Sequence, residues 1–299
     1  MDTNSNNCVI GLCVYNNEPG LPSVLSNIMK IHESKLFDKI TVVAYYDMSA
    51  DKSYSILELF KSSCSNSLSS KIETVIISNK KTQFRMSFGH TRVMDKYRTM
   101  RIANARNQIL NYIRVSQKQG KINKYFIMMD SNEYACVGKI NIDTLRDALE
   151  RSNEWDSISF DRQAGYYDYW ALSFNPHIYS FFHMQNRKEV QNSMVVDFAR
   201  KLNESRSSKD LIPVYSAYNG FAVYKTQMFL NCSYSSLIDL RLFPKEMLPS
   251  KILNHFENDC EHRKFHLEAI KKNGARIMVS PLSIFYKLPI PNPSLRGPA

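Results

Sequence analysis

An apolar run that ends in oxygen-bearing side chains is the strongest chemical signal in this chain. The run YFIMM at 125–129 is followed directly by DSNE at 130–133. Short apolar runs are typical of buried strands, and ligands of open α/β sheets bind at the carboxyl ends of the strands. Asp130 and Asn132 carry side-chain oxygens, which suit hard cations such as Mg²⁺ or Mn²⁺. The pattern predicts a cation site that can hold a diphosphate, and a solvated turn is the alternative.

Two further segments carry groups that suit a phosphorylated nucleoside. Asp47 follows a second apolar run at 40–46 and could accept hydrogen bonds from a base or a ribose. The polar residues after Asp47 could equally cap the next helix. Arg98, Arg101 and Asn104 are spaced three apart, so they share one face of a predicted helix. Because arginine binds phosphate oxygens bidentately, this face is a candidate phosphate site; a solvated helix face is the alternative.

The segment DCEHRKFH at 259–266 allows two interpretations. In the first, Asp259 or Glu261 is a general base at the mouth of a cleft. In the second, the segment binds zinc, although its spacing is not a standard zinc signature and no distant fourth ligand stands out. The zinc ligands would be Cys260, His262 and His266.

Composition and charge limit the functional classes. The chain has 299 residues, of which 43% are hydrophobic and 22% charged, as in an ordinary soluble globular protein. The net charge of +11 indicates an anionic partner. No run of five or six like charges marks a nucleic-acid tail. We therefore expect a phosphorylated small molecule as the partner, and no nucleic acid.

Cysteine usage and hydropathy bear on the compartment. The six cysteines form no CxxC pair and suggest no disulfide framework. The amino terminus MDTNSNN lacks the apolar core of a signal peptide. No apolar stretch approaches the roughly 20 residues that span a membrane. These features predict a cytoplasmic protein without a transmembrane segment.

The first half of the chain alternates between strand-like and helix-like segments. Such alternation predicts an α/β fold in which helices flank a mostly parallel sheet. Strands are expected at 9–15, 40–46, 75–78, 125–129, 155–160, 221–224 and 277–279, and helices at 21–28, 54–60, 102–113 and 260–272. Residues 163–185 are rich in aromatics, and 203–213 are expected to form a polar loop. We expect a single domain over 1–290, whose second half, 161–285, shares the sheet of the first, and a Pro-rich tail at 286–299.

Taken together, these segments resemble a GT-A glycosyltransferase. The likeness is strongest to the capsule-associated mannosyltransferase-like enzymes of fungi and to their relatives in large DNA viruses. It covers residues 8–285. The matching segments, in order, are YDMSADKSYSIL, RTMRIANARNQIL, YFIMMDSNE, GYYDYWAL, YNGFAVYK and DCEHRKFHLEAIKKNGARIMVSP.

The resemblance implies a fold, a reaction and a cofactor. The fold would be a Rossmann-like GT-A sheet, with the nucleotide sugar bound by residues 8–160 and the acceptor by 161–285. The reaction would transfer a hexose, with mannose as the candidate, from a nucleotide-diphosphate sugar to a glycan or protein acceptor. A divalent metal, Mn or Mg, would assist. If the chain is viral, its compartment would be the host cytoplasm.

The resemblance also implies roles for individual residues. For donor binding these are Asp47 at the nucleoside, Arg98, Arg101 and Arg106 at the phosphates, and Asp130. For the metal they are Asp130 and Asn132. For the acceptor they are Asp168 and Trp170 in the aromatic block, and Gly220. For catalysis they are Asp259 or Glu261.

Among other departures, the chain differs from the family at two positions of the metal site that the resemblance implies. Asn132 stands where the family's DxD motif has its second carboxylate, and the family's histidine near the carboxyl terminus is not evident. These departures keep a non-catalytic glycan-binding or virion-associated protein as one alternative. A nucleotidyltransferase is the other, although the chain lacks the usual Gly-rich phosphate loop near the amino terminus.

Overall fold

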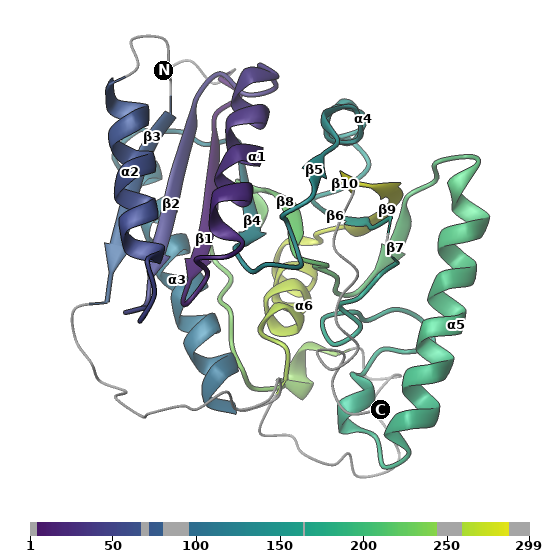
Figure 1. Cartoon of the computed structure of the whole chain (residues 1–299). Helices are drawn as coiled ribbons and strands as arrows, with labels where there is room; N and C mark the ends of the chain where they lie inside the picture. The colour runs from purple at the N-terminus through teal and green to yellow at the C-terminus, as the bar shows by residue number, and fades with distance from the viewer. Residues whose placement is uncertain (1–4, 67–71, 80–95, 164, 244–258, 287–299) are drawn as a thin grey trace.

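A computed structural model describes residues 5–66, 72–79, 96–163, 165–243 and 259–286. Within these ranges the chain folds around an eight-stranded sheet with the strand order β3-β2-β1-β4-β8-β6-β9-β7 (Figure 1). The strands are β1 Cys8–Val14, β2 Ile40–Tyr46, β3 Ile72–Ser78, β4 Tyr125–Asp130, β6 Ser157–Asp161, β7 Ile212–Val214, β8 Phe221–Lys225 and β9 Ile277–Ser283. A separate antiparallel pair consists of β5 Lys139–Ile140 and β10 Phe285–Tyr286.

Six of the eight strands run in the same direction, and β7 and β8 are antiparallel to their neighbours. The strand β8 lies between β4 and β6, so strands from both halves of the chain belong to one sheet. The predicted α/β class, with a mostly parallel sheet flanked by helices, is confirmed. The predicted division into one domain and a tail stays a prediction; Tyr286 is the last residue of β10, and residues 287–299 lie outside the described part.

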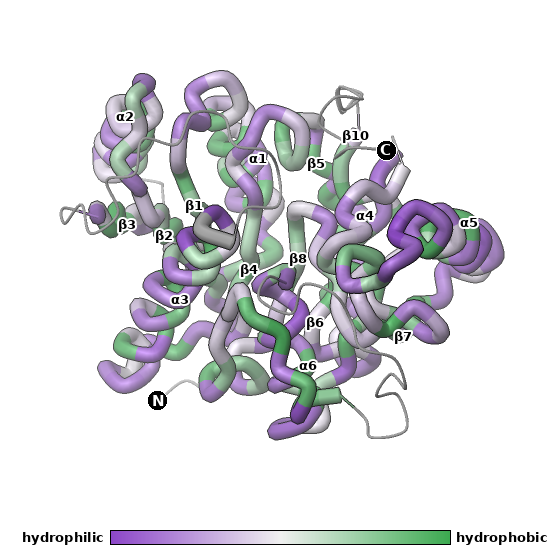
Figure 2. The backbone as a smooth tube through the Cα atoms, turned by 90° about the horizontal axis from the view of Figure 1, so that it is seen from below, coloured by the Kyte–Doolittle hydropathy of each residue, from purple (hydrophilic) through white to green (hydrophobic). Residues whose placement is uncertain are grey.

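Helices cover both faces of the sheet. They are α1 Leu21–Glu33, α2 Ser53–Asn66, α3 Lys96–Lys118, α4 Ile142–Glu150, α5 Arg187–Arg206 and α6 Glu261–Asn273. Alternate strand residues enter two separate cores. Val9 belongs to the core that includes residues of α3, α5 and α6, whereas Ile10 belongs to the core that includes residues of α1, α2 and α4. Because both faces are buried, β1 and β4 are apolar along almost their whole length, whereas β6 also carries buried Ser157 and Ser159. The hydrophobic strands lie inside and the hydrophilic surfaces of the helices outside (Figure 2).

The polar loop predicted at 203–213 is wrong at both of its ends, and no part of α5 was predicted from the sequence. The helix continues through the start of the expected loop to Arg206, and β7 begins at Ile212. Along its 20 residues α5 buries only Met194, Phe198 and Leu202. One buried residue per turn is too weak a periodic signal to stand out in a polar sequence.

The structure also bears on membrane-spanning helices and on disulfide bonds. None of their helices is long and apolar enough to cross a membrane. All six cysteines are described, and none of them is in a disulfide.

Candidate functional site

The register of the sheet brings the polar strand ends to one edge. Cys13 of β1 pairs with Asp130 of β4, and Val14 pairs with Tyr46 of β2. Asp47 and Asp130 therefore lie at the same carboxyl edge. The antiparallel strand β8 begins at Phe221, opposite the end of β4, so the residues before it reach this edge as well.

Asp130 is the centre of the site. Its carboxylate Oδ1 accepts hydrogen bonds from Tyr218 Oη at 2.9 Å and from Arg106 Nη2 at 3.2 Å. Among the described residues, its Oδ2 has one long contact, from Tyr167 Oη at 3.4 Å. The side chain is 23% exposed, so a ligand at the edge of the sheet can reach it.

Arg106 joins Asp130 to Glu261. The guanidinium of Arg106 is buried, and its Nε donates to Glu261 Oε1 at 3.1 Å. It also lies 4.5 Å over the ring of Tyr218. Three residues that the sequence named separately, from α3, β4 and the first turn of α6, are thus in one cluster. In the described part of the chain this cluster places a buried cation between two carboxylates.

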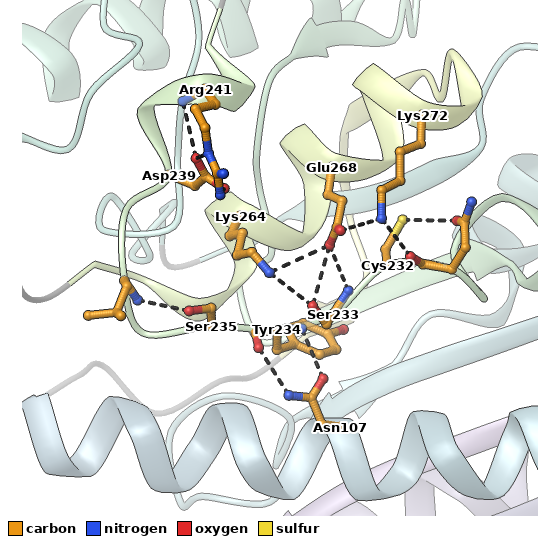
Figure 3. Close-up of polar contacts among 12 residues, drawn as sticks. Asn107, Cys232, Ser233, Tyr234, Ser235, Asp239, Arg241, Lys264, Glu268 and Lys272 are labelled. Atoms are coloured by element: carbon orange, nitrogen blue, oxygen red, sulfur yellow. Dashed lines mark hydrogen bonds and ion pairs between the residues drawn. The ribbon is translucent and has the colours of Figure 1, made fainter.

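Hydrogen bonds and an ion pair connect both α3 and α6 to the segment 232–235, which lies between them (Figure 3). Asn107, next to Arg106, donates to the carbonyl of Tyr234 and accepts from its N–H, at 3.0 and 2.9 Å. From α6, Glu268 accepts from the backbone N–H of Ser233 at 2.9 Å and forms an ion pair with Lys272. Because the same segment is bonded to both helices, it fixes the approach of Arg106 to Glu261.

A second ion pair lies at the end of β2. Arg101 donates from Nε and Nη2 to Asp47 Oδ2, at 3.1 and 2.7 Å, while Asn79 donates to Oδ1 at 3.2 Å. The guanidinium of Arg101 lies 4.6 Å over the ring of Tyr15. Arg98 is exposed on the same helix. Two of the predicted donor-binding residues, Asp47 and Arg101, are therefore paired with each other.

Asn132 closes a turn, which was the alternative that the sequence left open at this position. Its Oδ1 accepts the backbone N–H groups of Tyr134 and Ala135, at 3.2 and 2.8 Å, and so closes a turn. Gly20 packs against the same turn, and a Cβ at Gly20 would lie 2.8 Å from the carbonyl of Asn132. The solvated-turn alternative accounts for these contacts. The role of Asn132 as a metal ligand stays a prediction.

The donor set limits how a metal ion would fit. Mg²⁺ is commonly held by one or two carboxylates together with substrate phosphates. Asp130 Oδ2 is suited to such shared binding, whereas Oδ1 is occupied by Arg106 and Tyr218. The described residues include no group of three His, Cys, Asp or Glu side chains that could form a complete cage. The site therefore suits a metal ion that is bound jointly by Asp130 and by a phosphate group of the ligand.

The predicted acceptor residue Asp168 lies close to this cluster. Asn219 Oδ1 accepts the backbone N–H groups of Tyr167 and Asp168, at 3.1 and 3.3 Å. Burial raises the pKa of Asp168 to about 7; the N–H of Ala171 opposes the shift, and the carboxylates of Asp130 and Glu261 add to it. Asp168 therefore gains a proton near neutral pH.

Trp170 is held through its backbone. Its carbonyl accepts from Arg263 Nη2 at 2.6 Å. Its indole Nε1 is buried and has no hydrogen-bond partner in the described part of the chain. The acceptor role of Trp170 stays a prediction.

The backbone of Gly220 lies close to the side chain of Tyr167. It has φ +84°, and an added Cβ would lie 2.7 Å from Tyr167 Oη. Its carbonyl accepts the N–H of Asp130 at 2.8 Å. Gly220 thus positions the tyrosine that contacts Asp130, and the acceptor contact that the resemblance implies stays a prediction.

We expect Gly220→Ala to destabilise the chain by about 1–3 kcal/mol, since it adds both left-handed backbone strain and a clash. Urea unfolding measures the loss. As a control, Gly274→Ala also has a positive φ, but nothing lies within 4 Å of the added Cβ. Gly274→Ala should therefore cost only the strain. Equal losses in the two variants would show that the contact of Gly220 with Tyr167 is unimportant.

Asp259 and Glu261 have different surroundings. Asp259 is fully buried, and Arg263 Nε donates to both of its oxygens, at 3.1 and 3.0 Å. Arg263 also donates to the carbonyls of Leu172 and Ile178, so it anchors the aromatic segment to α6. The surroundings of Asp259 favour a structural role, and only Glu261 of this pair belongs to the Asp130 cluster.

The zinc interpretation of 259–266 finds no support in the described residues. The ring of His262 stacks on Tyr218 with centroids 3.9 Å apart. His266 contacts Ser216 Oγ through Nδ1 at 3.0 Å and Tyr224 Oη through Nε2 at 3.3 Å. Burial, together with Arg263 and Arg106, lowers the pKa of His266 to about 3. Both histidines are therefore parts of an aromatic core.

Sequence reasoning missed Tyr167, Tyr218 and Asn219. The available signal was the Asn219-Gly220 dipeptide, since Asn-Gly marks turns with positive φ. Both residues have positive φ, and the turn brings the Tyr218 hydroxyl to Asp130. No local pattern separates these tyrosines from the other aromatics of the chain.

A surface pocket of about 330 Å³ lies at the opposite edge of the sheet. Its lining includes Asn7, Lys39 and Lys121, and none of the residues of the Asp130 cluster. This pocket is therefore separate from the candidate site.

Comparisons with known proteins gave matches only among solved structures; no family model and no curated protein matches the chain. TarS of S. aureus, in a crystal structure of its first part, aligns with a TM-score of 0.43 and 13% identity, over 94% of this chain and 59% of that one. The mannosyltransferase PcManGT of Pyrobaculum calidifontis, solved with GDP-Man and Mn²⁺, gives 0.45 and 12%, over 94% and 58%.

Glucosyl-3-phosphoglycerate synthase of Mycobacterium tuberculosis, solved with Mn²⁺ and UDP, gives a TM-score of 0.43 and 10% identity, over 95% of this chain and 72% of that one. These neighbours are GT-A glycosyltransferases. This chain spans less than two thirds of the length of the first two.

Proposed function

We propose that this chain is a glycosyltransferase that transfers a hexose, with mannose as the first candidate, from a nucleotide-diphosphate sugar to a glycan or protein acceptor. The observation that carries the proposal is the cluster of Arg106, Asp130 and Glu261 at the carboxyl edge of the sheet. At this edge, α/β folds bind nucleotides. The neighbouring pair of Asp47 and Arg101 adds polar groups suited to a nucleoside.

The reaction needs positive charge where the diphosphate leaves. Arg98, which is exposed on α3, supplies a guanidinium group for phosphate oxygens. Arg101, one turn further along the same helix, is paired with Asp47 and adds a second positive charge. Arg106 is engaged by two carboxylates, so its part is to position Asp130. A divalent ion would be held by Asp130 Oδ2 together with the diphosphate, and when bound it would neutralise charge on the leaving group.

The acceptor hydroxyl needs a proton acceptor. Glu261 is paired with Arg106 and Asp259 with Arg263, and both pairs are buried. Asp168 has no ion pair with any described residue, and its carboxylate accepts the N–H of Ala171 at 3.2 Å. Because a general base works best with a pKa near the operating pH, we assign this role to Asp168.

The direct test is release of nucleoside diphosphate from a panel of UDP- and GDP-sugars by the full chain with Mn²⁺. We expect release with at least one donor, and a loss of about 10²-fold or more in Asp130→Asn. Asp143→Asn is the matched control, because the side chain of Asp143 is 89% exposed on α4. If no donor is turned over but nucleoside diphosphates still bind, a non-catalytic binding protein is the better description. If nothing binds, the proposal fails.

Asn132→Asp tests the metal role of this position. Asp can close the same turn as Asn, so we expect the fold to be unchanged. The added charge next to Asp130 should tighten Mn²⁺ binding on the order of tenfold in the presence of a nucleoside diphosphate. Calorimetric Mn²⁺ titration measures the change, with Asn141→Asp, which alters the cap of α4, as the control. Unchanged affinity would place residue 132 outside the metal site.

A further inference from the structure

Arg162 is a buried cation with an incomplete set of partners. It follows β6 directly and so stands at the carboxyl edge of the sheet, across β8 from Asp130. Its side chain is 1% exposed. Nη2 donates to the carbonyl of Tyr134 at 2.8 Å, whereas Nε and Nη1 have no hydrogen-bond partner in the described part of the chain.

Within the described residues, Arg162 also forms no ion pair, and the carboxylate of Asp161 attracts it only at longer range. Its neighbour in sequence, Asp161, is paired with Arg206 at 2.8 Å, and no other described carboxylate forms an ion pair with Arg162. A buried charge without a partner is unfavourable. Buried polar groups are nearly always hydrogen-bonded, so unused N–H groups on a buried guanidinium call for a ligand.

The surroundings of Arg162 connect it to the proposed site. Its guanidinium lies 4.4 Å over the ring of Tyr167, and the hydroxyl of Tyr167 contacts Asp130 at 3.4 Å. The rings of Tyr134 and Tyr167 meet edge to face, with centroids 6.1 Å apart. Both tyrosines are half-buried, so the groups that Arg162 contacts extend to the surface.

We propose that Arg162 binds an oxyanion, a phosphate or carboxylate group that belongs to the acceptor. Guanidinium N–H groups match the oxygens of these anions in geometry and charge. The position of Arg162, next to Tyr167 and on the second half of the sheet, fits a group other than the donor diphosphate. The inference rests on the proposed function, because it assigns the anion to the acceptor of that reaction.

The test is thermal unfolding of the full chain in inorganic phosphate and, separately, in acetate at the same ionic strength. Each titration is run with and without GDP and Mn²⁺. For wild type we expect phosphate, acetate or both to raise the Tm by several degrees at concentrations about 100-fold above the Kd, also when GDP is present. The response to the two anions distinguishes a phosphate from a carboxylate ligand.

Arg162→Met should abolish this shift and raise the Tm of the ligand-free chain, because an unpaired buried charge is removed. Arg200→Met is the matched control; Arg200 is 65% exposed on α5, where it pairs with Asp197, and its loss should leave the anion shift intact. An Arg162→Met variant with the wild-type anion shift, or a wild type without any shift, would overturn the proposal.

Two further outcomes keep the inference separate from the proposed function. If Arg162→Met does not fold, Arg162→Lys replaces it; lysine retains the charge without the guanidinium geometry, and we expect it to bind the anion about tenfold more weakly. Binding as tight as wild type in Arg162→Lys would overturn the assignment. If GDP and UDP do not bind but the anion shift depends on Arg162, the proposed function fails and the anion site stands.

Discussion

Arg106→Met is expected to lower the free energy of unfolding by about 3–5 kcal/mol, because it leaves buried Glu261 without its cation. Glu261 Oε1 lies 3.1 Å from Arg106 Nε, and its side chain is only 7% exposed. Asp130 would lose the same cation. Urea unfolding of the full chain, followed by circular dichroism, measures the change.

The control for Arg106→Met is Arg146→Met. Arg146 pairs with Asp143 on the surface of α4 at 3.0 Å, and such exposed pairs contribute only about 0–1 kcal/mol. A double variant, Arg106→Met with Glu261→Gln, should recover part of the loss, because the uncompensated charge is removed. A loss below about 1 kcal/mol in Arg106→Met would contradict the central place of this cation.

Asp168→Asn is expected to stabilise the chain at neutral and alkaline pH while it removes the proposed base. Burial raises the pKa of Asp168 from 3.8 to about 7, with Asp130 and Glu261 adding to the shift. The folded state therefore favours the protonated acid. The contribution of Asp168 to the free energy of unfolding is therefore largest below pH 4, declines as the pH rises, and is lost above about pH 7. The full difference corresponds to ~4 kcal/mol at most.

The measurement is the free energy of unfolding of wild type and Asp168→Asn between pH 4 and 9, in buffer with a chelator. The advantage of the variant should be small at pH 4 and should reach its full size above pH 7. Asp143→Asn, at an exposed position, should show no such trend. The rate of sugar transfer in Asp168→Asn should fall by about 10²–10⁴-fold. A pH-independent difference in stability would contradict the environment described for Asp168.

The strand ends at Asp47 and Asp130 were predictable from the sequence because β2 and β4 are nearly continuous apolar runs. Asp47 and Asp130 follow such runs, and parallel pairing then places them at one edge. The contacts between sites were not predictable. Arg106 precedes Asp130 by 24 residues and Glu261 by 155, so only the packing of α3 against α6 brings the three together.

The sequence also could not predict the role of a residue whose side chain suits two different functions. An amide two residues after a strand-end carboxylate suits a metal and a turn equally, and only the N–H contacts of Tyr134 and Ala135 reveal the turn at Asn132. In the same way, Asp259 and Glu261 look alike in sequence. They differ in the structure, because the Nε–H of Arg263 donates to both carboxylate oxygens of Asp259.

The most direct test of the central claim is calorimetric titration of the full chain with GDP and UDP in the presence of Mn²⁺. The proposed site predicts one saturable site per chain for at least one of these diphosphates. It also predicts binding at least about tenfold weaker in Asp47→Ala and Asp130→Asn, since each removes a charged hydrogen-bonding partner at the carboxyl edge. If neither diphosphate binds wild type, or if both variants bind as tightly as wild type, the nucleotide site is not at this edge of the sheet.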